Sequence, residues 1–245
     1  MTPEEAAVTI IIPCGGHHWQ FVADAVKSCM DSSEVPEAVI VIDDASDQFY
    51  ALPAYENLRV IRHRHAGRSA ARNLATKEAT TEWLFFLDAD DLLEPTAIPD
   101  FRHHLEANRQ PIGFLYADYD YLDGDGQRRR VEKEPFRHMK VRPMDRNYFN
   151  IGMFVRRTRF EEVGGFDEGM VFGEYWDFAL RYLRTATPLL VIKNDRPFIL
   201  AGAYSSVAAD PAAGMESATG KIQAMIRGGY YDRPILRGVG NAANV

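Results

Sequence analysis

Apolar residues gather in short runs along the first hundred positions, and amphipathic stretches separate these runs. Val39–Ile42 and Trp83–Leu87 are uninterrupted apolar runs, and Val8–Ile12 is a mostly β-branched run. This pattern is typical of parallel strands buried on both faces of a sheet. Residues 19–30 repeat apolar side chains at helical spacing, and Ser69 is placed to cap a helix that runs to about residue 80. The order predicts a mostly parallel α/β sheet with right-handed crossovers.

The pattern then loosens but still predicts elements. Leu58–Ile61 is a short third strand, and Pro95 suits the first turn of a helix that ends near residue 108. Residues 114–122 alternate aromatic and acidic side chains, and the turn sequence 123–126 leads into residues 127–132. This arrangement predicts a hairpin insertion.

Two further strands and a helix are predicted in the last third of the chain. Ile151–Val155 and Leu189–Ile192 are apolar strand candidates, and residues 176–183 carry apolar side chains on one helical face. From residue 201 onward Gly, Ala, Ser and Pro dominate, which predicts a loop-rich C-terminal tail.

Composition narrows the class of protein. The 245 residues are 46% hydrophobic and 26% charged, which is typical of globular domains. No run approaches the roughly 20 apolar residues of a membrane span. The acidic start, Met1–Glu5, is unlike a secretory signal, and Cys14 and Cys29 are expected to be reduced thiols. We expect a cytoplasmic protein, peripheral to the membrane surface at most. The net charge of −7 argues against a general nucleic-acid-binding surface.

Three carboxylates follow the strongest strand signal directly. Trp83–Leu87 leads into Asp88, Ala89, Asp90 and Asp91. Carboxylates this close repel one another unless a cation lies between them. A hard divalent ion, Mg²⁺ or Mn²⁺, prefers such oxygen ligands and is commonly bound together with a diphosphate. The alternative interpretation is a polar loop that closes the strand.

Four segments in a fixed order resemble the family-2 glycosyltransferases, which are inverting enzymes of the GT-A fold that use nucleotide-diphosphate sugars. The matching segments are Thr9–Pro13, Val39–Ser46 with Ala45 in place of a glycine, Gly67–Asn73 and Phe86–Asp91, with weaker matches at Val163–Glu168 and Gly173–Asp177. The resemblance implies a GT-A-like, Rossmann-like domain over residues 1–200. Its nucleotide-sugar half covers about 8–95 and its acceptor half about 110–200. The tail, 201–245, would pack on or over the active site.

The resemblance also implies site residues. Those for the nucleotide-sugar are Pro13, Asp43, Asp44, Arg72, Asp88, Ala89 and Asp90, and those for Mn²⁺ or Mg²⁺ are Asp88, Asp90 and Asp91. Asp90 would be the direct metal ligand, and Asp88 would reach the ribose or a metal-bound water. Asp44 would accept a hydrogen bond from the N3–H of uracil, a donor that cytosine lacks, which favours a UDP-sugar.

Two of these assignments have a purely structural alternative. The pair Asp43 and Asp44 also suits a simple turn. Arg72, expected in the first turn of its helix, is either directed at an anion or base or is an exposed surface arginine.

The segment expected to supply the catalytic base departs from the family pattern. The usual aspartate is replaced by Tyr175, which leaves Glu174 and Asp177 on one helical face. We prefer Glu174 as the base that removes the proton of the acceptor hydroxyl, with Asp177 second. The alternative is that Glu174 only balances the helix dipole, that Asp177 pairs with Arg181, and that the protein is inactive.

Residues 127–146 carry eight basic against three acidic side chains. They form either a solvated hairpin and loop or an acceptor rim for something anionic, such as a lipid diphosphate, an acidic glycan or DNA. The overall hypothesis is an inverting transferase that moves a sugar from a UDP-sugar to an acceptor hydroxyl. One alternative is a nucleotide-sugar-binding protein without catalysis. Another is a nucleotidyltransferase, although the glycine-containing segment Pro13–His17 has no nearby lysine.

Overall fold

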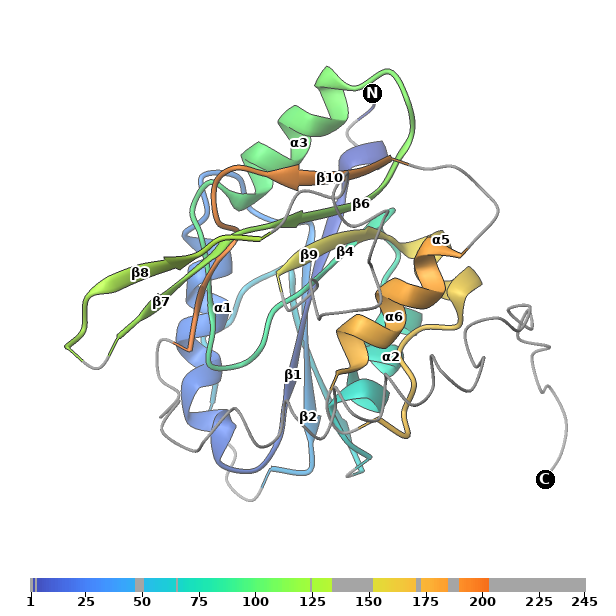
Figure 1. Ribbon diagram of the computed structural model, residues 1–245. Coiled ribbons are helices and arrows are strands. Elements are labelled where there is room, and N and C mark those ends of the chain that lie inside the picture. Colours follow the sequence, from blue (N-terminus) through green and yellow to red (C-terminus); the bar gives the residue numbers. More distant parts are fainter. Residues whose placement is uncertain are drawn as a thin grey trace, which may run out of the picture.

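A seven-stranded sheet forms the centre of the protein, in the order β10-β6-β9-β4-β1-β2-β3 (Figure 1). The computed structural model describes residues 2, 4–46, 51–64, 66–123, 125–133, 152–170, 173–184 and 190–202. The strands of this sheet are β1 (Val8–Cys14), β2 (Ala38–Asp44), β3 (Leu58–His63), β4 (Trp83–Phe86), β6 (Ile112–Ala117), β9 (Met153–Arg156) and β10 (Leu190–Asn194). All of them run parallel except β9, which pairs antiparallel with both β4 and β6. The predicted α/β class with a mostly parallel sheet is confirmed.

Helices cover both faces of the sheet. Alternate side chains of β1 point to opposite faces, so they pack in two separate hydrophobic cores. Ile10 and Ile12 of β1 pack in one core with α1 (Val22–Met30) and α3 (Ala97–Ala107). Ile11 packs in the other core with α2, α5 and α6. These three helices are α2 (Arg68–Glu78), α5 (Arg157–Val163) and α6 (Glu174–Leu183), and Figure 1 shows them together on one side of the sheet. Short 3-10 helices, Glu4–Ala6 and Gly16–Phe21, precede β1 and α1.

The predicted hairpin insertion is present as part of a second, four-stranded sheet in the order β5-β11-β7-β8. Its strands are β5 (Leu92–Leu93), β7 (Tyr119–Leu122), β8 (Arg128–Val131) and β11 (Ile199–Ala201). Strands β7 and β8 pair antiparallel, and in Figure 1 they extend away from the main sheet. The single strand expected over 114–122 is divided at Asp118 into β6 and β7. Of the predicted tail, 201–245, Ala201 ends β11, and the part from 203 onward lies outside the described residues.

Helix starts differ from the predictions in two places. The predicted cap at Ser69 is wrong, because α2 begins at Arg68 after Gly67, and Ser69 is buried inside the first turn. Helix α3 begins at Ala97, two residues after Pro95. Both shifts are small, but the first one moves Arg72 from the first turn of its helix to the second.

Strand β2 ends in a turn that places an alanine in an unfavourable backbone conformation. The Ser46 N–H donates to Asp43 Oδ1 at 2.8 Å and closes the turn. Ala45 has φ 59°, and no other non-glycine residue in the described part of the chain has a positive φ. The left-handed region costs an alanine about 1–2 kcal/mol, which explains why a glycine suits this position better.

We predict that Ala45→Gly leaves the melting temperature unchanged or raises it. Removal of the left-handed cost should offset the greater chain entropy of glycine in the unfolded state. Ala75→Gly in α2 is the control, because an ordinary helical alanine loses about 1 kcal/mol on this change. Thermal unfolding followed by circular dichroism measures both. An Ala45→Gly protein as destabilised as Ala75→Gly would contradict the strain at this turn.

Candidate functional site

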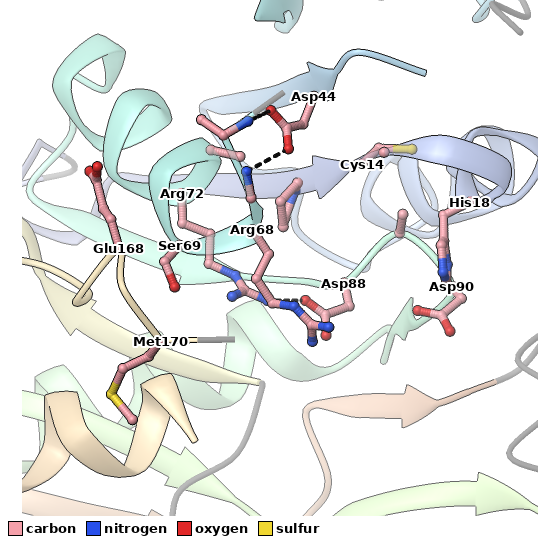
Figure 2. Close-up of a pocket in the computed structure, with 16 residues that line it drawn as sticks. Cys14, His18, Asp44, Arg68, Ser69, Arg72, Asp88, Asp90, Glu168 and Met170 are labelled. Atoms are coloured by element: carbon pink, nitrogen blue, oxygen red, sulfur yellow. Dashed lines mark hydrogen bonds and ion pairs between the residues drawn. The ribbon is translucent and has the colours of Figure 1, made fainter. Parts of the chain in front are cut away.

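A pocket of about 580 Å³ lies at the carboxyl ends of β1, β2 and β4. From β1 the chain continues to β2 and β3 on one side, whereas β4 lies on the other side of β1. Ligands of open α/β sheets bind at this kind of switch in strand order. The pocket is lined by Pro13, Cys14, Gly15, His18, Asp44, Ala66, Gly67, Arg68, Ser69, Ala71, Arg72, Asp88, Ala89, Asp90, Glu168 and Met170 (Figure 2). Its volume suits a ligand the size of a nucleotide.

Most of the residues proposed for the nucleotide-sugar meet in this pocket. Pro13, Asp44, Arg72, Asp88, Ala89 and Asp90 all line it. Four predicted residues do not: Asp43, Asp91, Glu174 and Asp177. Asp43 lies near the end of β2, and its fully buried side chain closes the turn that follows, so for this residue the structure favours the turn interpretation.

Asp44 holds the loop that leads into α2. Its Oδ1 accepts from the Ala66 N–H and its Oδ2 accepts from the Gly67 N–H, both at 2.8 Å. The side chain of His63 also lies near, with Nδ1 3.6 Å from Asp44 Oδ1. Each carboxylate oxygen has two lone pairs, so these bonds still leave Asp44 able to accept from a ligand.

Arg72 is buried, and the alternative of an exposed surface arginine is wrong. Only 1% of the residue is exposed, yet it lines the pocket. Its Nη1 donates to Glu174 Oε1 at 2.9 Å and its Nη2 donates to Asp88 Oδ1 at 2.5 Å. Burial opposes its charge, but the carboxylates of Asp88 and Glu174 raise the pKa of the guanidinium. Arg72 therefore stays charged inside the protein.

The acidic loop after β4 divides its three carboxylates between two environments. Asp88 and Asp90 line the pocket. Asp91 points elsewhere: its Oδ1 accepts from the Gly202 N–H at 2.6 Å, and its buried Oδ2 has no hydrogen-bond partner. Burial and the neighbouring Asp88 raise the pKa of both Asp90 and Asp91, which shows that negative charge on this loop is poorly compensated.

The donor set facing the pocket fits a weakly held Mg²⁺ or Mn²⁺. In the described part of the chain no three His, Cys, Asp or Glu side chains form a ready-made metal site. Two carboxylates, Asp88 and Asp90, are what Mg²⁺-type ions use when water and substrate phosphates complete the coordination. The raised pKa of Asp90 agrees with a site that lacks positive charge until a cation arrives.

The two carboxylates proposed as catalytic base are both buried. Asp177 is 0% exposed, and Arg181 donates to its Oδ2 from Nε at 2.9 Å and from Nη2 at 2.6 Å. Asp177 therefore pairs with Arg181, which was the structural alternative to a catalytic role, and we do not propose it as the base. Glu174 is 4% exposed and pairs with Arg72, so its role as base stays a prediction.

Tyr175 occupies the position of the usual aspartate but cannot replace it as a base. Its hydroxyl is buried without a hydrogen-bond partner, and its ring lies 4.8 Å from the Arg72 guanidinium carbon. Burial raises the pKa of this hydroxyl well above its ordinary value, so Tyr175 is neutral at physiological pH.

A clamp that was not predicted from the sequence lies beside the pocket, and one of its residues, Glu168, lines it. Asn73 Nδ2 donates to the Phe166 carbonyl and Asn73 Oδ1 accepts from the Phe166 N–H, both at 2.9 Å. Asn73 Nδ2 also donates to Glu168 Oε1 at 3.0 Å. A Cβ on Gly165 would lie 2.7 Å from Asn73 Oδ1, so only glycine fits there. The sequence features that could have revealed this clamp are the motif that ends in Asn73 and the two glycines before Phe166. Asn73 and Phe166 are 93 residues apart in the sequence.

The three arginines in the described part of the basic segment all pair with acidic side chains. On β8, Arg128 and Arg130 both donate to Asp120, and Arg129 donates to Asp123. This favours the solvated-hairpin interpretation for these three arginines. The remainder of the segment, 134–146, lies outside the described residues.

Comparisons with known proteins agree with the motifs. The family model described as Glycosyl transferase family 2 matches residues 9–164. The protein YwdF of Bacillus subtilis, named as an uncharacterized glycosyltransferase, is 25% identical over 178 residues, which cover 67% of this chain and 63% of YwdF.

Crystal structures of S. aureus TarS share the fold. TarS 1–349 superposes with a TM-score of 0.63 at 18% identity and covers 80% of this chain and 60% of that one. The same region in complex with UDP-GlcNAc gives a TM-score of 0.61 at 17% identity, covering 80% of this chain and 58% of that one. The chain thus spans about three fifths of these relatives. Within its described residues, no helix is both long and apolar enough to cross a bilayer.

Proposed function

The chain belongs to glycosyl transferase family 2, and on this basis we propose that it transfers a sugar from a UDP-sugar to an acceptor hydroxyl with inversion at the anomeric carbon. The observation that carries the proposal is the pocket itself. It joins a base-reading carboxylate, Asp44, to the paired carboxylates Asp88 and Asp90 at the switch point of the sheet. S. aureus TarS, which shares this fold, has been crystallised in complex with UDP and with UDP-GlcNAc, which supports UDP as the nucleotide.

Each end of the pocket has a distinct part in this proposal. Asp44 accepts from uracil N3–H while it keeps the Ala66 and Gly67 amides in place. Asp88 and Asp90 would lie beside the diphosphate and would hold Mn²⁺ or Mg²⁺. Such an ion would supply positive charge for the two phosphates and for the charge that grows on departing UDP.

Inversion follows from direct displacement. The acceptor oxygen forms a bond with the anomeric carbon while the bond from that carbon to the β-phosphate oxygen breaks, and the electron pair leaves with UDP. The acceptor proton passes to a base. In the segment expected to supply it, Tyr175 is neutral and Asp177 is bonded to Arg181, which does not line the pocket. Glu174 stays the proposed base, although it is buried and bonded to Arg72, and these contacts also fit a positioning role without proton transfer.

A second candidate function, nucleotide-sugar binding without catalysis, is favoured by Tyr175 at the position of the usual base. Both functions predict UDP binding, but only the first predicts release of UDP from a UDP-sugar when an acceptor is supplied. A nucleotidyltransferase is less well supported, because no lysine is among the described residues that line the pocket.

We predict that UDP raises the melting temperature more with Mn²⁺ than without it. Asp90→Asn should abolish the extra rise, because it removes a charged ligand from the pocket. Ligand at 100 times its dissociation constant stabilises a protein by about 2.7 kcal/mol, which a thermal-shift assay detects easily. Asp91→Asn is the matched control, since Asp91 already bonds to Gly202 and should keep the metal-dependent rise. An equal response to UDP with and without Mn²⁺ would refute the metal assignment.

We also predict that UDP binds more tightly than CDP by about tenfold or more. A hydrogen bond to a charged group contributes about 1.5–3 kcal/mol, and cytosine offers a lone pair where uracil offers N3–H. Asp44→Asn should narrow the difference, because its amide can donate to cytosine. Isothermal titration calorimetry of both nucleotides measures the preference. Equal affinity of the unmodified protein for UDP and CDP would remove Asp44 from base recognition.

A further inference from the structure

We infer that Glu174 is a positioning residue of the donor site, which acts through Arg72 to orient Asp88. The inference rests on the proposed function, since Asp88 is there taken to face the donor. It assigns a role that involves no proton transfer, and this role leads to a different experimental outcome from that of a base.

The contacts form a continuous chain from helix α6 to the acidic loop. The Glu174 carboxylate accepts from one terminal nitrogen of Arg72 at 2.9 Å, and the other terminal nitrogen donates to Asp88 at 2.5 Å. The side chains of Glu174 and Arg72 are only 6% and 1% exposed, whereas that of Asp88 is 25% exposed. Only the Asp88 end is open enough to meet a ligand freely.

Aromatic rings hold the middle of this chain in one orientation. The Arg72 guanidinium carbon lies 5.5 Å from the centre of the Phe166 ring and 4.8 Å from that of Tyr175. These two rings also meet each other edge to face, with centroids 5.1 Å apart. Because Tyr175 fills this space, the replacement of the usual aspartate supplies packing for Arg72 instead of a carboxylate.

The charge balance makes Glu174 necessary for this geometry. Arg72 is buried with two carboxylate partners, and its Nε has no hydrogen-bond partner. If Glu174 loses its charge, Asp88 must compensate the guanidinium alone, and Arg72 is drawn toward the pocket. Groups that orient a ligand-binding side chain from behind commonly change binding or activity by about 10–100-fold when they are altered.

The test compares Glu174→Gln with Asp177→Asn in the full chain. Both variants neutralise a buried carboxylate of α6 that is bonded to an arginine. Glu174 pairs with Arg72, which lines the pocket, whereas Asp177 pairs with Arg181, which does not. We expect Glu174→Gln to weaken the binding of UDP with Mn²⁺ by about 10–100-fold in isothermal titration calorimetry. Asp177→Asn should lower the melting temperature and leave UDP affinity within about twofold of the unmodified protein.

A double-mutant cycle tests whether the effect passes through Asp88. In an Asp88→Asn background, Glu174→Gln should cost little additional UDP affinity, because the group that it orients is already altered. Full additivity of the two changes would overturn the inference. Glu174→Asp keeps the charge but is one methylene shorter, so it must shift Arg72 to keep the contact and should lose UDP affinity, by less than Glu174→Gln does. If the Gln variant does not fold, an Asp variant with unmodified UDP affinity would overturn the inference equally.

The outcomes separate this inference from the proposed function. An unmodified protein that does not bind UDP would defeat both. An unmodified protein that binds UDP, together with a Glu174→Gln protein that binds it equally well but transfers slowly, would overturn the positioning role and support Glu174 as the base.

Discussion

Burial of the charged Arg72 side chain is the constraint on which the site depends. A guanidinium removed from water needs close carboxylates, and loss of one partner of a buried ion pair typically costs about 3–5 kcal/mol. Its two partners come from different elements, Glu174 from the start of α6 and Asp88 from the loop after β4. Helix α2, strand β4 and helix α6 must therefore be in place together before the pocket has its shape. The shape of the pocket therefore depends on helix α6 as well as on the N-terminal elements α2 and β4.

The clamp formed by Asn73 also joins helix α2 to the segment before α6, by hydrogen bonds. Asn73, one residue after Arg72, bonds to both backbone groups of Phe166, and the Phe166 ring in turn packs beside Arg72. The motif at residues 67–73 and the motif at 163–168 are therefore parts of one structural unit. This explains physically why two segments that are distant in sequence occur together in the resemblance to family 2.

The strands could be predicted from the sequence where a local pattern of apolar residues determines them. Continuous apolar runs identified β1, β2 and β4, because a strand buried on both faces has no polar side. The resemblance to family 2 implied that Asp44, Asp88 and Asp90 belong to one site, and their meeting in the pocket fits parallel strands whose carboxyl ends share one edge of the sheet. Burial of Arg72 and Glu174 was not predictable in this way, because it depends on contacts 102 residues apart. The prediction of a cap at Ser69 was wrong for a similar reason. The residue at the N-cap position is Gly67, and its N–H is bonded to Asp44, a contact outside the local sequence.

We propose that Arg72 holds the pocket in shape from behind, while Asp44, Asp88 and Asp90 contact the nucleotide. A crystal structure of the protein with UDP and Mn²⁺ tests it most directly. The account predicts uracil beside Asp44, the diphosphate beside Asp88 and Asp90, and Arg72 still bonded to both Glu174 and Asp88. UDP bound outside this pocket, or Arg72 turned away from both carboxylates, would contradict it.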